Sequence, residues 1–344
     1  MLRVNREQLL NSLESVSAGL AAKATVEQSS MFCFKDERVW TYNDEICASA
    51  VSPLEGLAGV IKADKLIDIL RKLQEDELDV DVEDNKLIIL GMRKDVELVL
   101  QKDIQLPIDK LDSPNEWNPL PGDFSEALTM VSQCCSRDKS LFMLTCINIT
   151  DKWLESCDNT QVIRYKMKLK LPTSALVRGE SVKHVVQLDV TEFSETGAWL
   201  HFRNPAGVVI ACRKFVFDYK DLSGPLTVDG GTRAILPKGL VEAADRAEVF
   251  SSDGNDSNKI LVELKPGKLL VRGQGASGQY RESKKVEYKG EPLSFRVAPK
   301  LLKEICTKHN ECELTKNRLK VKGEKFTYVV CLSAAEPDKP KVEE

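Results

Sequence analysis

Long hydrophobic runs, aromatic residues and histidine are scarce in this chain of 344 residues. No stretch reaches the roughly 18 apolar residues that a membrane-spanning helix needs, and the opening MLRVNREQLL lacks the apolar core of a secretory signal peptide. A hydrophobic content of 42% and a charged content of 30% are otherwise ordinary for a globular protein. We therefore expect an intracellular protein that has no membrane partner.

Cysteine is present but lacks the spacing of a metal site or a disulfide framework. The ten cysteines include no C-x-x-C pair, and only Cys134 and Cys135 are adjacent. Most lie in apolar stretches such as VVCL and IAC, where a reduced cysteine behaves as a small hydrophobic residue. The three histidines, His184, His201 and His309, are far apart in the chain. The sequence thus predicts core thiols, no metal ion and no cofactor.

Motifs of catalysis are also missing. No P-loop occurs, and the G-x-G-x-x-G match from Gly273 to Gly278 is followed by QYRESKKVEYKG, which alternates like a strand and does not resemble a phosphate-binding helix. A flexible turn is the better interpretation. Asp44 and Asp158 end equivalent strands, which favours repeated turn chemistry over a catalytic carboxylate pair. An enzyme with a degenerate site would still need a convergent acid, base or nucleophile, so we predict no enzymatic activity.

One pattern occurs three times along the chain. Residues 60–100, 169–217 and 295–332 each run from a strand through a small or proline-containing turn into a short apolar-periodic helix, and then into short alternating strands. A first helix and a pair of strands precede each copy. The first helices are expected at Arg6–Leu20, Phe124–Cys134 and Lys238–Phe250. The hairpin turns are expected at Asp36-Glu37, Thr150-Asp151 and Pro266-Gly267.

The predicted fold class is α+β, a triplicated module in which two helices pack on an antiparallel sheet. Two connectors rich in proline, glycine and polar residues separate the copies, at residues 107–122 and 218–235. The last residues, SAAEPDKPKVEE, have no apolar periodicity and are predicted to be disordered. At roughly 115 residues, each module is large enough for its own core. The predicted domains are residues 1–112, 113–230 and 231–333, with a tail at 334–344.

This arrangement resembles the bacterial-type DNA sliding clamp, the beta subunit of the replicative DNA polymerase, over essentially the whole chain. The most specific points are the opening LRVNREQLLNSLESVSAGLAAKAT with Lys23 and Thr25, the strand ends Asn43-Asp44 and Cys157-Asp158, and the closing Tyr328-Val329-Val330. The chain departs from the family at residues 156–160, where the family usually has Thr-Asp-Gly-His-Arg, and at Cys331-Leu332-Ser333, which replaces Met-Pro-Met. These departures suggest a divergent, phage-encoded member with an altered peptide pocket.

The resemblance implies a ring. Modules joined edge to edge form a continuous curved sheet with helices on the concave side, and head-to-tail dimerisation closes it without leaving a strand edge. Double-stranded DNA lies inside such a ring, where Lys and Arg neutralise phosphates without reading bases, so that the ring slides. The net charge of −4 does not oppose this, because the placement of the 49 Lys and Arg residues matters more than the sum. The expected location is the cytoplasm of a bacterial cell or of a phage-infected host.

Basic residues on or just beyond the helices are the candidates for DNA contact. In the family, the position held here by Lys23 and the loop around Arg137 and Lys139 contact DNA. For any single residue, a solvated helix face is an equally good explanation. The full candidate set is Lys23, Lys65, Arg71, Lys72, Arg137, Lys139, Arg178, Lys183, Lys300 and Lys303.

A groove between the second and third modules is the second site that the resemblance implies. Family members use it to capture short peptides of polymerases and clamp loaders, and an apolar cleft with a polar rim suits such a ligand. Ordinary packing between domains is the alternative. The corresponding positions are Thr160, Gln161, Val162, Pro225, Val228, Val329, Cys331 and Leu332.

The resemblance also places the dimer interface. Val96 and Leu98 share one face of the alternating strand 95–100, and Val249 and Phe250, at the end of the third module's first helix, take the partner positions. Burial within one domain is the competing interpretation. The predicted function is thus a homodimeric sliding clamp, a processivity factor of DNA replication that binds a replicative polymerase and a clamp loader. A monomeric three-module adaptor, which binds peptides without encircling DNA, is the alternative.

Overall fold

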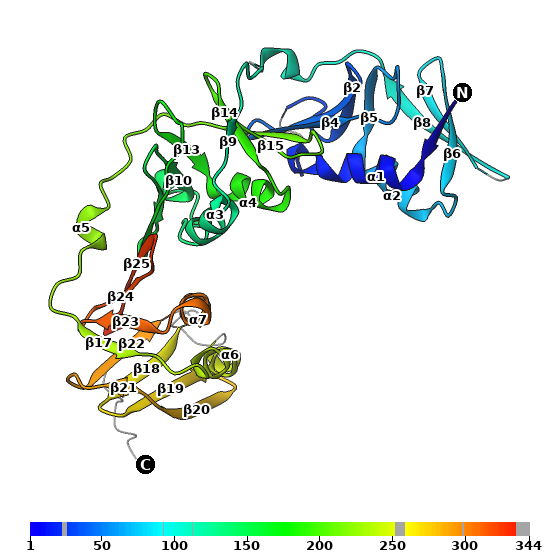
Figure 1. Cartoon of the computed structure of the whole chain (residues 1–344). Helices are drawn as coiled ribbons and strands as arrows, with labels where there is room; N and C mark the ends of the chain where they lie inside the picture. The colour runs from blue at the N-terminus through cyan, green and yellow to red at the C-terminus, as the bar shows by residue number, and fades with distance from the viewer. Residues whose placement is uncertain (23–25, 92, 112, 252–258, 298, 335–344) are drawn as a thin grey trace. The chain divides into compact units, whose positions relative to one another are not determined.

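The computed structural model describes residues 1–22, 26–91, 93–111, 113–251, 259–297 and 299–334, and it divides into two compact units (Figure 1). The first unit comprises Met1–Leu154 with Met167–Tyr219, and the second comprises Glu155–Lys166 with Lys220–Glu344. The division falls inside strand β11 (Trp153–Cys157). None of the helices within these residues is long and apolar enough to cross a membrane.

Antiparallel strands of the first unit form one sheet that has twelve members over the described residues. In order across the sheet, the strands are β1 (Leu2–Asn5), β6 (Glu77–Glu83), β7 (Lys86–Gly91), β8 (Lys94–Gln101), β5 (Gly59–Lys62), β2 (Met31–Lys35), β3 (Arg38–Tyr42), β4 (Ile46–Val51), β16 (Val209–Arg213), β15 (Trp199–Arg203), β14 (Glu192–Glu195) and β9 (Asn118–Pro119). A further ladder joins β10 (Cys146–Ile149) to β13 (Ala175–Arg178).

The α-helices of the first unit lie along one side of its sheet (Figure 1). They are α1 (Arg6–Ser15), α2 (Ala63–Lys72), α3 (Phe124–Ser132) and α4 (Gly179–Gln187). The accompanying 3₁₀ helices are η1 (Ser17–Gly19), η2 (Pro107–Lys110) and η3 (Phe142–Thr145). α1 begins at Arg6 because the Asn5 side chain accepts a hydrogen bond from the Gln8 N–H at 3.0 Å. Leu9 and Leu13 form its buried face.

The first helix is shorter than predicted, since α1 ends at Ser15 and not at Leu20. The chain then tightens into η1, where Gly19 lies against Thr41. A Cβ at Gly19 would overlap the Thr41 side chain, so this close approach requires glycine. The helical periodicity of the sequence continues past Ser15, but packing against β3 ends the regular helix there.

The middle of the first unit's sheet is buried on both faces. Alternate side chains of a strand point to opposite faces, and Phe32 and Cys33 on β2 are both fully buried. α2 packs on β2 and β5. Leu106 and Ile108, which follow β8, pack in a cluster with Cys33. The predicted connector 107–122 therefore begins as part of the core.

Seven of the ten cysteines are buried in the core, Cys135 and Cys306 are half-buried, and Cys331 is exposed. All ten are free. Burial raises the pKa of Cys33 and the pKa of Cys212 to about 12, so both thiols stay protonated at neutral pH. A protonated, buried thiol is a poor nucleophile and a poor metal ligand.

The second unit contains two groups of paired strands. One runs β12 (Gln161–Lys166), β25 (Phe326–Cys331), β24 (Arg318–Lys322), β23 (Glu311–Leu314), β17 (Thr232–Ile235) and β21 (Glu287–Tyr288). The other runs β20 (Gly278–Lys285), β19 (Lys268–Gly275), β18 (Ile260–Lys265), β22 (Leu293–Val297) and β26 (Ser333–Ala334). The helices are α5 (Ser223–Leu226), α6 (Leu240–Ser251) and α7 (Pro299–Lys308). α6 packs on α7 and covers β18, β19 and β20.

The order of elements repeats three times along the chain. Each repeat has a helix, four strands, a second helix and three more strands. The last repeat contains β21 as an additional strand. The repeats run from α1 to β8, from α3 to β16 and from α6 to β25. The predicted α+β class and triplicated module are confirmed. The exact domain boundaries, 1–112, 113–230 and 231–333, stay predictions.

Antiparallel ladders join consecutive repeats edge to edge. β4 of the first repeat pairs with β16 of the second, and Ile46 lies opposite Cys212. β12 of the second repeat pairs with β25 of the third, and Gln161 lies opposite Val330. The joint β4–β16 lies inside the first unit and the joint β12–β25 inside the second. The third strand of one repeat thus pairs with the last strand of the next.

Two of the three predicted hairpin turns have the backbone that such turns require, whereas the third closes at Thr150 and Trp153, one residue later than the predicted Thr150-Asp151. Asp36 and Glu37, between β2 and β3, have φ values of 52° and 57°. Positive φ at both positions is the mark of a type I′ turn, whose twist matches that of the flanking strands. Gly267, between β18 and β19, has a φ of 75°. Both turns lie where the sequence predicted them.

Asn43 and Asp158 hold equivalent turns in two repeats. Asn43 Oδ1 accepts a hydrogen bond from the Ile46 N–H at 2.9 Å, and Asp158 Oδ1 accepts one from the Gln161 N–H at 2.8 Å. Side-chain oxygens that bind nearby backbone N–H groups stabilise such turns. The expected repeated turn chemistry is therefore present, but the first copy uses Asn43 and not Asp44.

The G-x-G-x-x-G match is a hairpin, as expected. β19 and β20 pair from Lys268 opposite Lys285 to Gly275 opposite Gly278. Gly273 lies directly beneath α6, where a Cβ would overlap the carbonyl oxygen of Ala247. The first glycine of the motif therefore serves close packing of a helix on a strand.

Gly273→Ala is expected to lower the free energy of unfolding by about 1–3 kcal/mol, because the backbone of α6 must move away from β19. Urea unfolding followed by circular dichroism measures the change. Gly122→Ala is the matched control, since no atom lies within 4 Å of a Cβ at Gly122. Equal stability of the two variants would contradict the close packing of α6 on β19.

Candidate nucleic-acid and partner surfaces

The loop between α3 and η3 presents two basic side chains. Asp138 holds the turn of this loop by accepting hydrogen bonds from the Ser140 hydroxyl at 2.7 Å and the Ser140 N–H at 2.9 Å. These bonds lower the pKa of the Asp138 carboxyl. Arg137 and Lys139 are exposed on either side of Asp138, and neither forms an ion pair with a described residue. The loop therefore offers two unneutralised charges on an ordered turn.

Lys72 and Lys183 add to these charges. Lys72 ends α2, Lys183 lies in α4, and both side chains are exposed. Neither forms an ion pair with a residue of the described ranges. α2 and α4 lie on the helical side of the first unit (Figure 1). Among the predicted DNA contacts, Lys72, Lys183, Arg137 and Lys139 are therefore the exposed basic residues whose charge is not neutralised by a described carboxylate.

Two other predicted contacts are partly neutralised. Lys65 lies 3.9 Å from the carboxylate of Asp64, and Arg71 lies 2.7 Å from that of Glu14. The side chains of Lys65 and Arg71 remain 64% and 57% exposed. Exposed ion pairs of this kind are weak, at about 0–1 kcal/mol, so both residues can exchange their carboxylate for a phosphate.

Arg178 occupies a different environment from the one predicted. Its side chain is only 8% exposed and lies 4.0 Å from Glu45 and 3.8 Å from Glu180. The guanidinium lies 5.2 Å from the ring centre of Phe142. Contacts with two carboxylates and a ring explain this arginine as a packing residue, and we do not include it among the proposed DNA contacts.

Lys303 is likewise engaged within the protein. Its ammonium donates to Asp245 at 2.6 Å and to Glu248 at 2.7 Å, both on α6. These hydrogen bonds raise the pKa of Lys303 and tie α7 to α6. Lys23 and the side chain of Lys300 lie outside the described residues, so both remain predictions from the sequence.

β12 and β25 bring the predicted groove residues together in the second unit. Val162 lies opposite Val329 in the ladder, and the Cys331 N–H donates to the Thr160 carbonyl at 2.7 Å. The short helix α5, which contains Pro225, packs on both strands. Residues that are more than 160 positions apart in the sequence therefore form one surface.

Much of the predicted groove is closed by its own packing. The buried members are Gln161, Val162, Val228, Val329 and Leu332, each at most 8% exposed. The exposed members are Thr160, Pro225 and Cys331. Gln161 also accepts a hydrogen bond from the Tyr328 hydroxyl at 2.9 Å, which fixes its side chain. A peptide can reach the exposed members directly, but the apolar floor beneath them is covered.

The predicted interface residues keep accessible apolar surface. Val96 and Leu98 are half-buried on β8, and Val249 is 65% exposed near the end of α6. The ring of the half-buried Phe250 lies against Gly278, since a Cβ there would be 3.3 Å from it. The absence of a side chain at Gly278 thus leaves room for the Phe250 ring.

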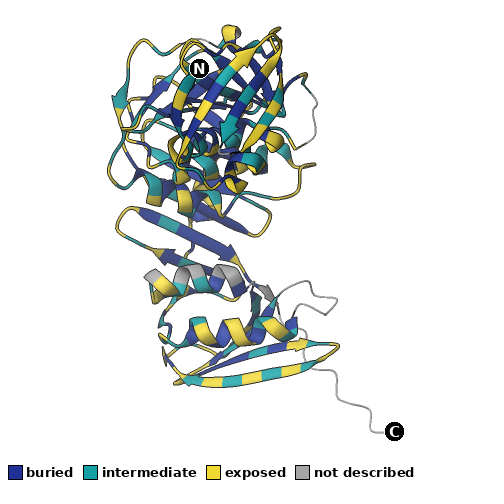
Figure 2. Ribbon diagram, turned by 90° about the vertical axis from the view of Figure 1, so that its right-hand side faces the viewer, coloured by how far each residue is buried: buried dark blue, intermediate teal, exposed yellow. Residues whose placement is uncertain are grey.

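Open strand edges lie next to these residues. β8 pairs with β7 over Lys94–Val99 but meets β5 only at Leu100 and Gln101, so within the described residues its other edge has no ladder over Lys94–Val99. β20 is the last strand of its sheet and alternates between exposed and half-buried residues (Figure 2). The β8 edge was expected from the sequence, whereas the β20 edge was not. Alternation identifies a strand but not its neighbours.

Solved structures match almost the whole chain. A DNA polymerase sliding clamp from Bacillus subtilis superposes with a TM-score of 0.82 at 16% sequence identity, covering 97% of this chain and 99% of that one. The DNA polymerase III beta chain of Streptococcus pneumoniae and the beta subunit of Thermotoga maritima give TM-scores of 0.81 and 0.78 at 16% and 15% identity, again covering 97% and 99%. This chain has the sliding-clamp fold. No protein-family model and no curated protein sequence matches it.

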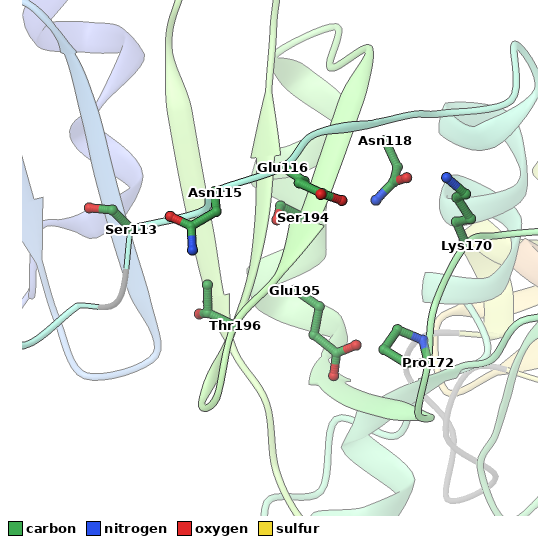
Figure 3. A pocket seen from close by; sticks show the side chains of 9 residues that line it. All are labelled: Ser113, Asn115, Glu116, Asn118, Lys170, Pro172, Ser194, Glu195 and Thr196. Carbon is green, nitrogen blue, oxygen red and sulfur yellow. The ribbon is translucent and has the colours of Figure 1, made fainter.

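The clamp fold of this chain also contains a polar cavity that the sequence did not indicate. It has a volume of about 780 Å³ in the first unit, and its walls come from three separate stretches of chain (Figure 3). The lining residues are Ser113, Asn115, Glu116, Asn118, Lys170, Pro172, Ser194, Glu195 and Thr196. Glu195 is ion-paired with Lys214 and accepts a hydrogen bond from Thr173 at 3.0 Å. The cavity shares no residue with the predicted DNA, groove or interface sets.

The described part of the clamp fold shows no group of three or more His, Cys, Asp or Glu side chains that could hold a metal ion. Its candidate surfaces are instead basic, apolar or formed by strand edges. Such surfaces suit binding to phosphates, to apolar peptides and to other strands.

Proposed function

We propose that this protein is a DNA sliding clamp. Two copies close head to tail into a ring in the cytoplasm, and duplex DNA passes through the ring. The proposal rests mainly on the threefold repeat of the clamp fold along the chain, which leaves β20 and β8 as open edges. Pairing these edges between two copies would close the sheet and leave neither edge exposed.

The proposed DNA contacts are Arg137, Lys139, Lys72 and Lys183, with Lys65 and Arg71 in support. All six lie on or beside the helices of the first unit. Their ammonium and guanidinium groups suit phosphate oxygens, which have the same spacing in every sequence. Contacts of this kind hold DNA without preferring a register, so the ring slides.

The proposed partner surface is formed by the exposed groove members Thr160, Pro225 and Cys331. A peptide of a replicative polymerase or of a clamp loader docks there and opens the apolar floor by displacing side chains. The ring itself performs no chemistry, because its role is to keep the polymerase on the template. This role is consistent with the basic and apolar character of the described surfaces.

The mass of the purified protein tests the ring against a monomeric adaptor. Size-exclusion chromatography with light scattering is expected to show twice the mass of one chain at micromolar concentration, because a ring of six repeats needs two copies. Dilution should yield single chains without loss of helix signal, since each unit has its own core. A single-chain mass at every concentration would refute the ring and favour the peptide-binding adaptor.

A further inference from the structure

The internal joints pair corresponding strands of neighbouring repeats. β4, β12 and β20 are the third strands of their repeats, whereas β8, β16 and β25 are the last. The joints β4–β16 and β12–β25 each pair a third strand with the last strand of the following repeat. Within the described residues, β20 and β8 are the third and last strands without such a partner.

The registers of the two joints can be compared by counting residues from the hairpin turn at the end of each strand. In the third strands, the reference residues that close the hairpin are Ile46 in β4, Gln161 in β12 and Gly278 in β20. In the last strands, the hairpins close at Val208, Phe326 and Lys94. The reference residue is the next one along the strand, which is Val209 in β16, Thr327 in β25 and Asp95 in β8. Each set occupies the same position in the three repeats.

Both joints have the same antiparallel register. In the first joint, the reference residue of β16 lies opposite Ser49, three residues after the reference residue of β4. In the second joint, the reference residue of β25 lies opposite Arg164, three residues after the reference residue of β12. The same register applied to the open edges places Asp95 of β8 opposite Arg281 of β20.

We propose that two copies of this chain join through β8 of one copy and β20 of the other in this register, and that the opposite charges of Asp95 and Arg281 select that partner. The inference rests on the proposed ring and adds to it the register and the charge pair. On the opposite face of the same strands, the register places Lys94 opposite Glu282.

The outward charges at the two edges are unbalanced in a single chain. Asp95 and Arg281 are exposed, and neither forms an ion pair with a residue that the structure describes. Arg281 lies directly opposite Arg272 in the β19–β20 ladder, and Arg272 is 3.6 Å from Glu263. Like charges in directly opposed positions destabilise a sheet, whereas opposite charges stabilise it. An aspartate across the open edge of β20 therefore offsets the repulsion between the arginines.

The inward side chains fit the same register. Val96 comes to lie opposite Tyr280, and Leu98 opposite Gly278. Because Gly278 has no side chain and the Phe250 ring packs beside it, Leu98 meets the Phe250 ring across the joint. Leu98 and Phe250, which the resemblance placed on the two sides of the dimer interface, thus become neighbours in this register. A register shifted by one residue would instead turn the outward charges toward this apolar face.

The second charge pair needs an ionised carboxylate on β20. Hydrogen bonds from Lys284, Tyr280 and Arg246 lower the pKa of Glu282 to about 2. Glu282 is therefore negative at neutral pH. Lys94, which lies 2.9 Å from Glu75 in the single chain, becomes its opposite-charge neighbour across the joint.

Charge reversal tests the register and the charge pair. Asp95→Arg and Arg281→Asp each place like charges at both joints of a homodimer, so each is expected to raise the dimer Kd about 30-fold. An equimolar mixture of the two variants is expected to recover wild-type affinity, because each joint of the mixed ring then holds one aspartate and one arginine. Analytical ultracentrifugation over a concentration series measures all three constants.

Asp79→Arg is the matched control, because Asp79 is exposed on β6, on the same face as Asp95 but two strands from the open edge. Its dimer Kd is expected to stay within about twofold of wild type. A dimeric wild type whose reversed variants do not recover on mixing would refute the register and the charge pair while leaving the ring intact. A wild type that is monomeric at all concentrations would refute the ring as well.

Discussion

Replacing Val96 and Phe250 together with aspartate is expected to convert the dimer into soluble monomers. Val96 lies on β8, and Phe250 lies at the end of α6 against β20. Each joint of the proposed ring would then bury two carboxylates without partners. An unpaired buried charge costs about 3–5 kcal/mol, and a ring has two joints, so the dimer Kd is expected to rise by more than about 1000-fold. Light scattering and sedimentation measure the mass.

The control for this variant carries the same charges elsewhere. Val82→Asp with Val216→Asp changes side chains that are 44% and 95% exposed, so it is expected to leave the dimer intact. Circular dichroism should be the same for both double variants, because neither change enters a core. If the Val96→Asp, Phe250→Asp protein keeps the mass of a dimer, the two copies associate through a different surface.

A ring closed on nicked circular DNA is expected to stay bound, and to be lost when the circle is linearised. Protein diluted below its dimer Kd is concentrated in the presence of nicked plasmid, so that rings close around DNA without a loader. Gel filtration at high salt follows, because phosphate contacts weaken steeply with salt and retention then reports topology. Nearly all bound protein should remain on circles and nearly none on linear DNA.

Arg137→Ala with Lys139→Ala separates contact from topology in the same experiment. The double variant is expected to bind DNA more weakly, with a log–log salt dependence that is flatter by about one unit per lost contact. Its retention on circles at high salt should nevertheless equal that of wild type. Lys265→Ala with Lys268→Ala, at exposed positions on the hairpin of β18 and β19, is the matched control and should change neither quantity. Equal retention on circular and linear DNA, or a preference for particular base sequences, would contradict the clamp.

The repeat and the fold class could be predicted from the sequence because both depend on patterns of neighbouring residues. The apolar spacing of α2 and the alternation of β18 and β20 between more and less buried residues depend on residues a few positions apart. Turn residues such as Asp36-Glu37 and Pro266-Gly267 mark where hairpins reverse. Three copies of such a pattern support one another, so the order of elements was predicted more reliably than any single boundary.

Other features depend on residues that are distant in the sequence. α1 ends early because Gly19 packs on Thr41. Arg178 lies against Phe142 and two carboxylates, so its charge is used inside the protein although its position near a helix start suggested an exposed one. β12, β25 and α5 bring groove residues together from distant parts of the chain, but most of these residues are buried. No local signal reports which partners a side chain meets.

The sequence by itself determined the threefold module, the helices and hairpins within it, and the absence of a recognisable catalytic motif. Only the tertiary structure decided which strands remain open. β19 and β20 are paired strands of the same length, yet β19 has neighbours on both sides and β20 on one. Side-chain alternation reports the two faces of a strand, whereas an open edge concerns the backbone N–H and C=O groups, whose partners come from distant segments. The joint between Asp95 and Arg281 became visible for that reason only when the two internal joints could be compared in space.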